Sequence, residues 1–149
     1  VFIALSILGK PDTIEATMVA APTGVDEQIA VLFKYNNGAM AQLFSSFVTN
    51  LPTQAEINGT EGCITLTTRF YEPSAIIQLS KKIPYEREVI PVEKEAGFGY
   101  HYEARHVNEC LKKGLVESPV VTHVDTLLLM EILDTIRNKA RIEYPQDKL

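Results

Sequence analysis

The order of apolar and polar residues divides the chain into a short apolar opening, a strand-rich middle and a helical last third. Residues 13–20 alternate with a period of two, which is typical of a strand whose two faces differ. Residues 28–35 and 39–48 lie on either side of Asn36-Asn37-Gly38. Because Asn and Gly tolerate the positive φ angles of a tight turn, this segment predicts a β-hairpin.

Later segments complete the expected elements. Strands are expected at 54–57, 63–67, 74–80 and 86–92, with the last at an edge or frayed because Pro84 and Pro91 flank it. An apolar stripe at helical spacing then runs to Gly114, and a second helix begins at a Thr122–Asp125 capping box and continues to about Ala140. Strands followed by helices predict an α+β fold with one large, mainly antiparallel, open-faced sheet and helices packed on one face.

The opening run, Val1 to Gly9, is apolar and is followed by Pro11. It is much shorter than the ~20 residues that span a bilayer, and no basic residues precede it as in a signal peptide. Gly and Pro are typical of helix ends, so residues 1–9 are expected to be the tail of a buried helix. Because the chain lacks an initiating Met, we expect it to be part of a longer protein.

Several expected strands are apolar on both faces. Ile29, Val31 and Phe33 share one face of their strand, whereas Ala30 and Leu32 share the other. A sheet with one face in water shows cleaner alternation. We therefore expect helices of this domain to cover one face and a second copy of the chain to cover the other, as a homodimer or higher homo-oligomer.

Composition narrows the class of protein. The 149 residues are 46% hydrophobic and 22% charged, with a net charge of -5, which suits a single globular domain over 1–149. An acidic surface disfavours nucleic acid and anionic membranes as partners. Cys63 and Cys110 lack a second ligand at metal-binding spacing, which predicts reduced thiols, no metal site and a cytoplasmic location.

Two segments contain candidate site residues. The loop Gly97-Phe98-Gly99 is the only G-x-G, and it follows charged residues rather than a buried strand, so it does not predict a dinucleotide site. Tyr100, His101 and Tyr102 follow it and could either line a substrate pocket or pack around the start of a helix. Ser46, at a strand end, could bind a polyol or carbonyl, although hydroxyl residues are also common there for structural reasons. No residue is assigned a catalytic or cofactor-binding role.

The order of several motifs resembles the C-terminal domain of the Gfo/Idh/MocA oxidoreductases, nearest to their dimeric dihydrodiol dehydrogenase-like members. The motifs are Ile57-Asn58-Gly59-Thr60-Glu61-Gly62-Cys63-Ile64, Gly99-Tyr100-His101-Tyr102-Glu103-Ala104, Glu117-Ser118-Pro119-Val120 and Tyr144-Pro145-Gln146-Asp147-Lys148. The resemblance covers almost the whole chain, and it implies a fold like the C-terminal domain of glyceraldehyde-3-phosphate dehydrogenase.

The resemblance also implies that the N-terminal and C-terminal domains have different functions. Family members bind NAD or NADP on an N-terminal Rossmann domain and transfer a hydride to or from a sugar, polyol or dihydrodiol. Their proton-transfer lysine belongs to that N-terminal half. This chain would then supply the dimer interface and part of the substrate pocket, and would lack activity alone. Two alternatives remain at this point: a helix-grip carrier with a concave cavity, and a purely structural dimerisation module.

Overall fold

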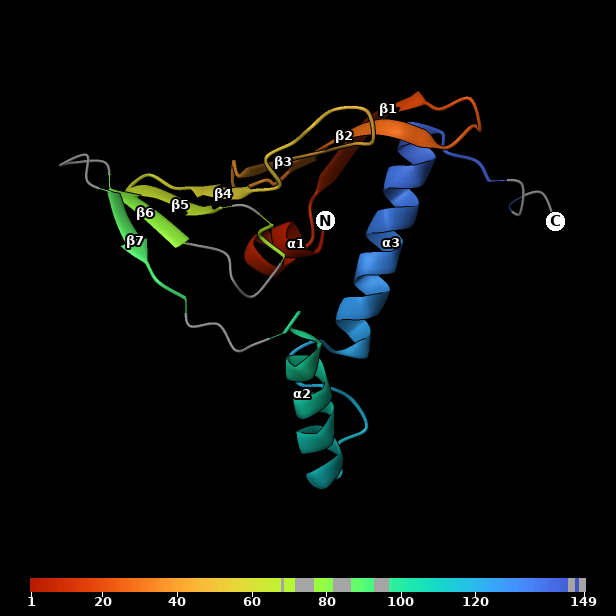
Figure 1. Ribbon diagram of the computed structural model, residues 1–149. Coiled ribbons are helices and arrows are strands. Elements are labelled where there is room, and N and C mark those ends of the chain that lie inside the picture. Colours follow the sequence, from red (N-terminus) through yellow and green to blue (C-terminus); the bar gives the residue numbers. More distant parts are fainter. Residues whose placement is uncertain (68, 72–76, 82–86, 93–96, 145–146, 148–149) are drawn as a thin grey trace. The chain divides into compact units, whose positions relative to one another are not determined.

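A computed structural model describes residues 1–67, 69–71, 77–81, 87–92, 97–144 and 147, in which one helix is followed by a run of strands and then by two further helices (Figure 1). The chain forms two compact units. The first consists of Val1–Leu51 together with Pro119–Leu149, and the second is Pro52–Ser118. The first unit is therefore built from both ends of the chain, with the second inserted between them.

The first unit contains an antiparallel sheet in the order β1-β2-β3, formed by β1 (Thr13–Ala20), β2 (Asp26–Lys34) and β3 (Met40–Ser46). The turn between β2 and β3 confirms the predicted hairpin. Gly38 has a φ of 88°, and its N–H donates to the carbonyl of Tyr35 at 2.9 Å. The Asn37 side-chain oxygen accepts from the N–H of Ala39 at 3.0 Å, so the Asn-Gly pair closes the turn as expected.

One face of this sheet forms the core of the first unit. The register places Ile14 opposite Phe33 and Phe33 opposite Ala41, so these three side chains share a face. Helix α3 (His123–Ala140) packs on β1 and contributes Ile132 and Ile136 to the same core (Figure 1). Phe33 and Ile132 are fully buried, which makes them the largest apolar side chains removed from water.

The other face of β1–β3 carries a mixture of polar and large apolar side chains, which we call the open face. In register across it lie Glu15, Leu32 and Gln42, and next to these Thr17, Ala30 and Phe44. Phe44 is 54% exposed, and Val19 and Met40 are exposed as well. The expectation that some strands are apolar on both faces is therefore confirmed for β2.

One terminus of each helix in the first unit has the cap that the sequence predicts. Helix α1 (Phe2–Leu8) stops at Gly9, whose φ of 75° favours glycine, and the Gly9 N–H donates to Leu5 at 2.9 Å. Helix α3 begins with a complete capping box, in which the Thr122 hydroxyl accepts from the Asp125 N–H and the Asp125 carboxylate accepts from the Thr122 N–H. Within the described residues, no helix is both long and apolar enough to span a membrane.

The second unit contains β4 (Ala55–Asn58), β5 (Gly62–Leu66), β6 (Ile77–Lys81) and β7 (Arg87–Ile90), paired antiparallel in chain order. The Gly59 N–H donates to the Gly62 carbonyl at 2.8 Å and closes the β4–β5 turn. Strand β7 lies at the edge of this sheet, which confirms the prediction made from Pro91. Pro84 and parts of the strands expected at 74–80 and 86–92 lie outside the described residues.

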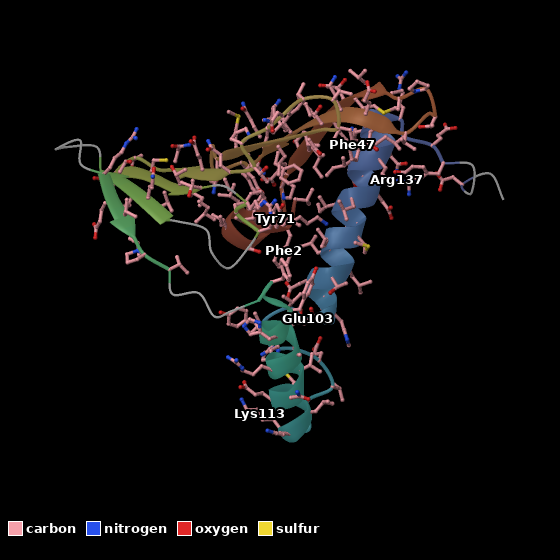
Figure 2. All side chains as sticks on the ribbon, in the orientation of Figure 1. Phe2, Phe47, Tyr71, Glu103, Lys113 and Arg137 are labelled. Carbon is pink, nitrogen blue, oxygen red and sulfur yellow. The ribbon has the colours of Figure 1, made fainter. Side chains whose placement is uncertain are left out.

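Helix α2 (Tyr100–Lys112) completes the second unit, and Glu103 and Lys113 lie near its two ends in Figure 2. It ends at Lys113 and Gly114, where the Gly114 N–H donates to Leu111 at 3.0 Å and φ is 68°. The predicted α+β class with antiparallel pairing is confirmed. Within the described residues the strands pair as two ladders, of three and four strands. Alternation in a sequence identifies strands without identifying their partners.

Candidate functional site

The loop that leads into α2 owes its shape to two glycines. Gly97 has a φ of 116° and Gly99 a φ of 92°, and a side chain at either position would be strained. Gly99 is the N-cap of α2, and its carbonyl accepts from the Tyr102 N–H at 3.0 Å. The three aromatic candidates therefore occupy the first turn of a helix whose start is fixed by backbone geometry.

In that turn and just before it, the aromatic side chains divide into a stacked pair and an exposed pair. The rings of His101 and Tyr102 lie 4.1 Å apart between centroids, and the Arg105 guanidinium lies 5.8 Å from the Tyr102 centroid. Both stacked rings are half-buried, whereas Tyr100 is 78% exposed and Phe98 is also exposed. Tyr100 is therefore the residue of this turn that is most open to solvent, and the stacked residues His101 and Tyr102 follow it in the sequence.

Ser46 lies at the end of β3, in the other unit, and its hydroxyl already has three hydrogen-bond partners. Its Oγ accepts from the N–H groups of Val48 and Thr49, both at 3.1 Å, and lies 3.3 Å from the Gln28 Oε1 to which it donates. A hydroxyl has one donor and two acceptor sites, so these contacts use all of them. Ser46 shapes the turn after β3, a role that its position at a strand end did not distinguish from ligand binding.

His106 of α2 contacts one residue of its own helix and one residue that follows the helix. Its Nε2 lies 2.8 Å from Oγ of Ser118 and 3.5 Å from Sγ of the buried Cys110. The His106 ring is therefore hydrogen-bonded within the second unit. Both cysteines, Cys63 and Cys110, are free thiols.

Two hollows in the first unit were not anticipated from the sequence. One, of about 490 Å³, surrounds Arg137, which pairs with Asp134 and Asp147 and stacks on Tyr144. The other, of about 300 Å³, lies between α1 and the start of α3; we call it the α1–α3 groove. Neither is lined by Ser46, Tyr100, His101 or Tyr102. The groove is lined by Phe2, Leu5, Ser6, Val120, Val121, Asp125 and Leu128.

Two side chains have pKa values shifted from their ordinary range. Burial raises the pKa of the Tyr35 phenol, and the negative charge of Asp12 raises it further. Hydrogen bonds from the Thr122 side chain and backbone lower the pKa of the Asp125 carboxyl. The raised pKa keeps the Tyr35 phenol protonated in the core. The lowered pKa keeps the Asp125 carboxylate charged at the N-terminus of α3, where the helix dipole favours a negative charge.

The loop before α2 differs in context from the dinucleotide fingerprint of a Rossmann domain. In that fingerprint a strand leads directly into a helix through a glycine-rich turn that binds the pyrophosphate. In the part of the chain that the structure describes, β7 ends at Ile90 and α2 begins only at Tyr100, with Tyr102 where a small residue is needed. No three His, Cys, Asp or Glu side chains of the described residues are grouped as metal ligands.

Residues 1–65 match the model of the GFO/IDH/MocA C-terminal domain. Over 142 residues the chain is 33% identical to trans-1,2-dihydrobenzene-1,2-diol dehydrogenase from Sus scrofa, a match that covers 93% of this chain and 42% of that protein. Residues 1–65 belong to the GFO/IDH/MocA C-terminal domain family, and nearly the whole chain is similar to this dehydrogenase. The resemblance noted in the sequence motifs is thereby confirmed, and the chain spans less than half the length of the curated relatives that it matches.

Solved structures share the fold of this GFO/IDH/MocA C-terminal domain at low sequence identity. UDP-N-acetylglucosamine 3-dehydrogenase GnnA from Acidithiobacillus ferrooxidans aligns with a TM-score of 0.78 at 16% identity, over 93% of this chain and 44% of that one. Levoglucosan dehydrogenase, in complex with NADH and levoglucosan, aligns with a TM-score of 0.73 at 17% identity, over 97% of this chain and 48% of that one. These likenesses confirm the α+β fold.

Proposed function

We propose that this chain is the substrate-side and oligomerisation domain of an NAD(P)-dependent oxidoreductase that acts on a sugar, a polyol or a dihydrodiol. The observation that carries the proposal is the 33% identity to a dihydrodiol dehydrogenase over 93% of this chain. A structural neighbour, levoglucosan dehydrogenase in complex with NADH and levoglucosan, supports the cofactor and the substrate class. The complete reaction requires residues that this chain does not supply.

The nucleotide and the proton-transfer lysine belong, in this proposal, to a Rossmann domain that precedes Val1 in the longer chain. The absence of a strand–glycine–helix arrangement from the described residues supports this assignment. Bound NAD or NADP would exchange a hydride with the substrate carbon. The present domain would position the substrate and exclude water from that step.

Tyr100 is the residue that we propose contacts the substrate. Its phenol hydroxyl can donate to one substrate hydroxyl and accept from another, which suits a polyol. The His101–Tyr102 stack and the Gly99 cap fix the helical turn from which it projects, so the hydroxyl would be positioned with little loss of side-chain entropy. In this proposal His101 and Tyr102 line the wall of the substrate pocket. Ser46 holds the backbone of the turn after β3 and does not itself bind the substrate.

The open face of β1–β3 is, in the same proposal, the surface through which two copies associate. A two-fold axis across one face brings each apolar side chain against a copy of the same patch. Val19, Met40 and Phe44 project from that face and are exposed in the single chain. Phe44 and Leu32 lie on neighbouring strands near its centre, flanked by the Glu15–Lys34 ion pair of 2.6 Å.

Steady-state kinetics of the longer gene product test the substrate role. We expect Tyr100→Phe to raise KM for the polyol or dihydrodiol about fivefold, because one substrate hydrogen bond is worth ~1 kcal/mol, with kcat and NAD(P) affinity nearly unchanged. Tyr71→Phe, at another exposed tyrosine of the second unit, is the matched control and should leave KM unchanged. An unchanged KM in Tyr100→Phe would favour a purely structural dimerisation module.

The cofactor assignment has its own test. The longer gene product should bind NADH or NADPH saturably, and the 149-residue chain alone should bind neither. Saturable binding by the short chain would contradict the division of labour. Failure of the longer product to oxidise or reduce any sugar, polyol or dihydrodiol with either nucleotide would contradict the proposed function as a whole.

A further inference from the structure

The chain contains two Asn-Gly pairs, and both lie at hairpin turns. Asn37-Gly38 lies between β2 and β3, and Asn58-Gly59 lies at the turn between β4 and β5. All four residues are exposed to solvent. An Asn that precedes Gly can lose its side-chain amide to water, because Gly has no side chain to hinder the approach of its backbone nitrogen to the Asn Cγ. The two turns therefore offer the same chemistry in two different structural settings.

The turn between β2 and β3 is held by side chains as well as by the backbone. The Asn37 side-chain oxygen accepts from the Ala39 N–H at 3.0 Å, and the neighbouring Asn36 is bonded twice to the Asp12 carboxylate. The Tyr35 N–H donates to the Ala39 carbonyl at 3.1 Å and closes the base of the turn. The Asn37 amide is therefore fixed in orientation, and the backbone around it cannot rearrange without the loss of several hydrogen bonds.

The turn between β4 and β5 has fewer constraints. The Gly59 N–H donates to the Gly62 carbonyl at 2.8 Å. Within the part of the chain that the structure describes, the Asn58 side chain forms no hydrogen bond. Asn58 is the last residue of β4, so its amide group lies at the exposed end of a short strand and is not held in one rotamer by a partner.

We propose that Asn58 is a site of spontaneous deamidation in the folded protein and that the structure protects Asn37 from the same reaction. The Gly59 backbone nitrogen forms a bond to the Asn58 Cγ, the Cγ–Nδ2 bond breaks, and ammonia leaves with the proton of the Gly59 N–H. Water then adds across one C–N bond of the five-membered imide and leaves aspartate or isoaspartate at position 58. The reaction consumes water only, and nothing is oxidised or reduced.

The hydrogen bond of the attacking nitrogen makes the rate depend on local opening of each turn. The Gly59 N–H must leave its one acceptor, and the Gly38 N–H must likewise leave the Tyr35 carbonyl, to which it donates at 2.9 Å. At the second site the Asn37 side chain must also leave its own hydrogen bond. One additional hydrogen bond lowers the population of the reactive form about fivefold, so we expect Asn58 to deamidate at least about fivefold faster than Asn37.

The products would change both the charge and the backbone at the end of β4. Glu56 lies two residues before Asn58 and shares its face of the strand, so a new carboxylate at position 58 would meet a like charge. Isoaspartate also inserts one extra carbon into the backbone, which is incompatible with the register that pairs Asn58 with Cys63. The modification would therefore weaken the β4–β5 hairpin.

Peptide mapping by mass spectrometry of the longer gene product tests the proposal. The folded protein is incubated in neutral buffer, and a parallel sample is incubated in urea. We expect aspartate and isoaspartate to accumulate at least about fivefold faster at Asn58 than at Asn37 in the folded protein, and at similar rates in urea, where neither turn is formed. Equal rates in the folded protein, a faster reaction at Asn37, or no reaction at Asn58 would overturn the proposal.

Two variants test the cause of the difference. In Gly59→Ala the added Cβ would lie 3.7 Å from the nearest oxygen, which is an ordinary contact, so the fold should tolerate it. We expect this variant to slow deamidation at Asn58 several-fold, because a side chain hinders the attacking nitrogen. Asp12→Ala removes both bonds to Asn36 and should speed deamidation at Asn37 several-fold, with no change at Asn58. An unchanged rate at Asn58 in the first variant, or at Asn37 in the second, would overturn the proposal.

Discussion

The carboxylate of Asp12 accepts two hydrogen bonds from Asn36, one from its backbone N–H at 2.7 Å and one from its side-chain Nδ2 at 2.8 Å. Asp12 precedes β1, and Asn36 begins the turn after β2. The pair therefore ties the entrance of the sheet to its hairpin turn. Two hydrogen bonds to one Asn fix the turn more firmly than a single bond, because the second bond keeps the two residues together when the first breaks.

Removal of this pair should weaken the first unit. We expect Asp12→Ala to lower the free energy of unfolding by about 1–2 kcal/mol, since hydrogen bonds to a charged group are worth somewhat more than neutral ones. Asp12→Asn retains one acceptor oxygen and should lose less. Urea denaturation measures both, and an equal loss in the two variants would contradict the two-bond account.

The Tyr35 phenol should make stability fall at high pH. Its pKa is raised in the folded chain by burial and by Asp12, whereas the unfolded phenol ionises near its ordinary value of 10.0. The raised pKa therefore contributes stability that is fully present below about pH 10 and is lost as the pH rises through the folded-state pKa. Tyr35→Phe should lose less stability than the native chain between pH 9 and about pH 11.

At neutral pH the same substitution should have the opposite effect. The Tyr35 hydroxyl donates to the Gly9 carbonyl, and Tyr35→Phe removes that bond at a cost of about 1 kcal/mol. Two denaturation series, at pH 7 and across the alkaline range, measure the two effects separately. A parallel decline of both proteins above pH 10 would contradict the assignment to Tyr35.

The Thr122 hydroxyl should contribute about 1 kcal/mol through the cap of α3. We expect Thr122→Ala to lower the melting temperature, whereas Thr126→Ala, one turn later, should change it little. The Asp125 pKa is lowered chiefly by the Thr122 hydroxyl, so its stabilising effect is present above the ordinary pKa of 3.8 and is lost as the pH falls through the lowered folded-state value. The difference between Thr122→Ala and the native chain should therefore narrow in acid.

Phe33 and Phe47 make a matched pair for the core. Phe33 is 0% exposed and Phe47 is 84% exposed in the same unit. We expect Phe33→Ala to cost about 3–5 kcal/mol because it leaves a cavity, and Phe47→Ala to remain within about 0.5 kcal/mol of the native chain. Guanidinium denaturation gives both values. Similar losses in the two variants would place the core elsewhere.

Phe44 tests the open face as a dimer surface. In a two-fold interface Phe44→Asp introduces an unpaired carboxylate on each copy, so we expect the dimer dissociation constant to rise roughly a hundredfold. Val89→Asp, at an exposed valine of β7, should leave it unchanged. Sedimentation velocity over a range of concentrations measures the shift. A native chain that stays monomeric throughout would contradict this use of the face.

Local patterns predicted the elements of the fold well, because the forces involved act over a few residues. The Asn37-Gly38 turn and the Thr122–Asp125 box were both identifiable, since each depends on side chains next to the backbone groups that they bond. The division into two ladders was not predicted. Alternation in Thr13–Ala20 or Ala55–Asn58 indicates a strand, but the partner of a strand is decided by tertiary packing.

The candidate site was less accessible to prediction, and Ser46 illustrates the physical reason. Its hydroxyl oxygen accepts hydrogen bonds from the N–H groups two and three residues later. These bonds form in a turn whose geometry depends on where β3 ends. The α1–α3 groove was missed because Leu5 and Leu128 are far apart in sequence and each looks like an ordinary core residue in its own helix. The substrate role proposed for Tyr100 would depend on groups from outside the chain, which no pattern within it can specify.

The construction of the first unit from both ends of the chain has a consequence for how the protein folds. Lys10 and Glu131 meet across 121 residues of sequence, and α3 covers the apolar face of β1–β3 only once that distance is closed. During synthesis the β2–β3 hairpin leaves the ribosome before α3 does, and its apolar face stays exposed to solvent until α3 has been synthesised. Strands β4–β7 can pair locally in the meantime. Docking of α3 should therefore be the slow, late event of folding, and a polypeptide truncated before His123 should aggregate.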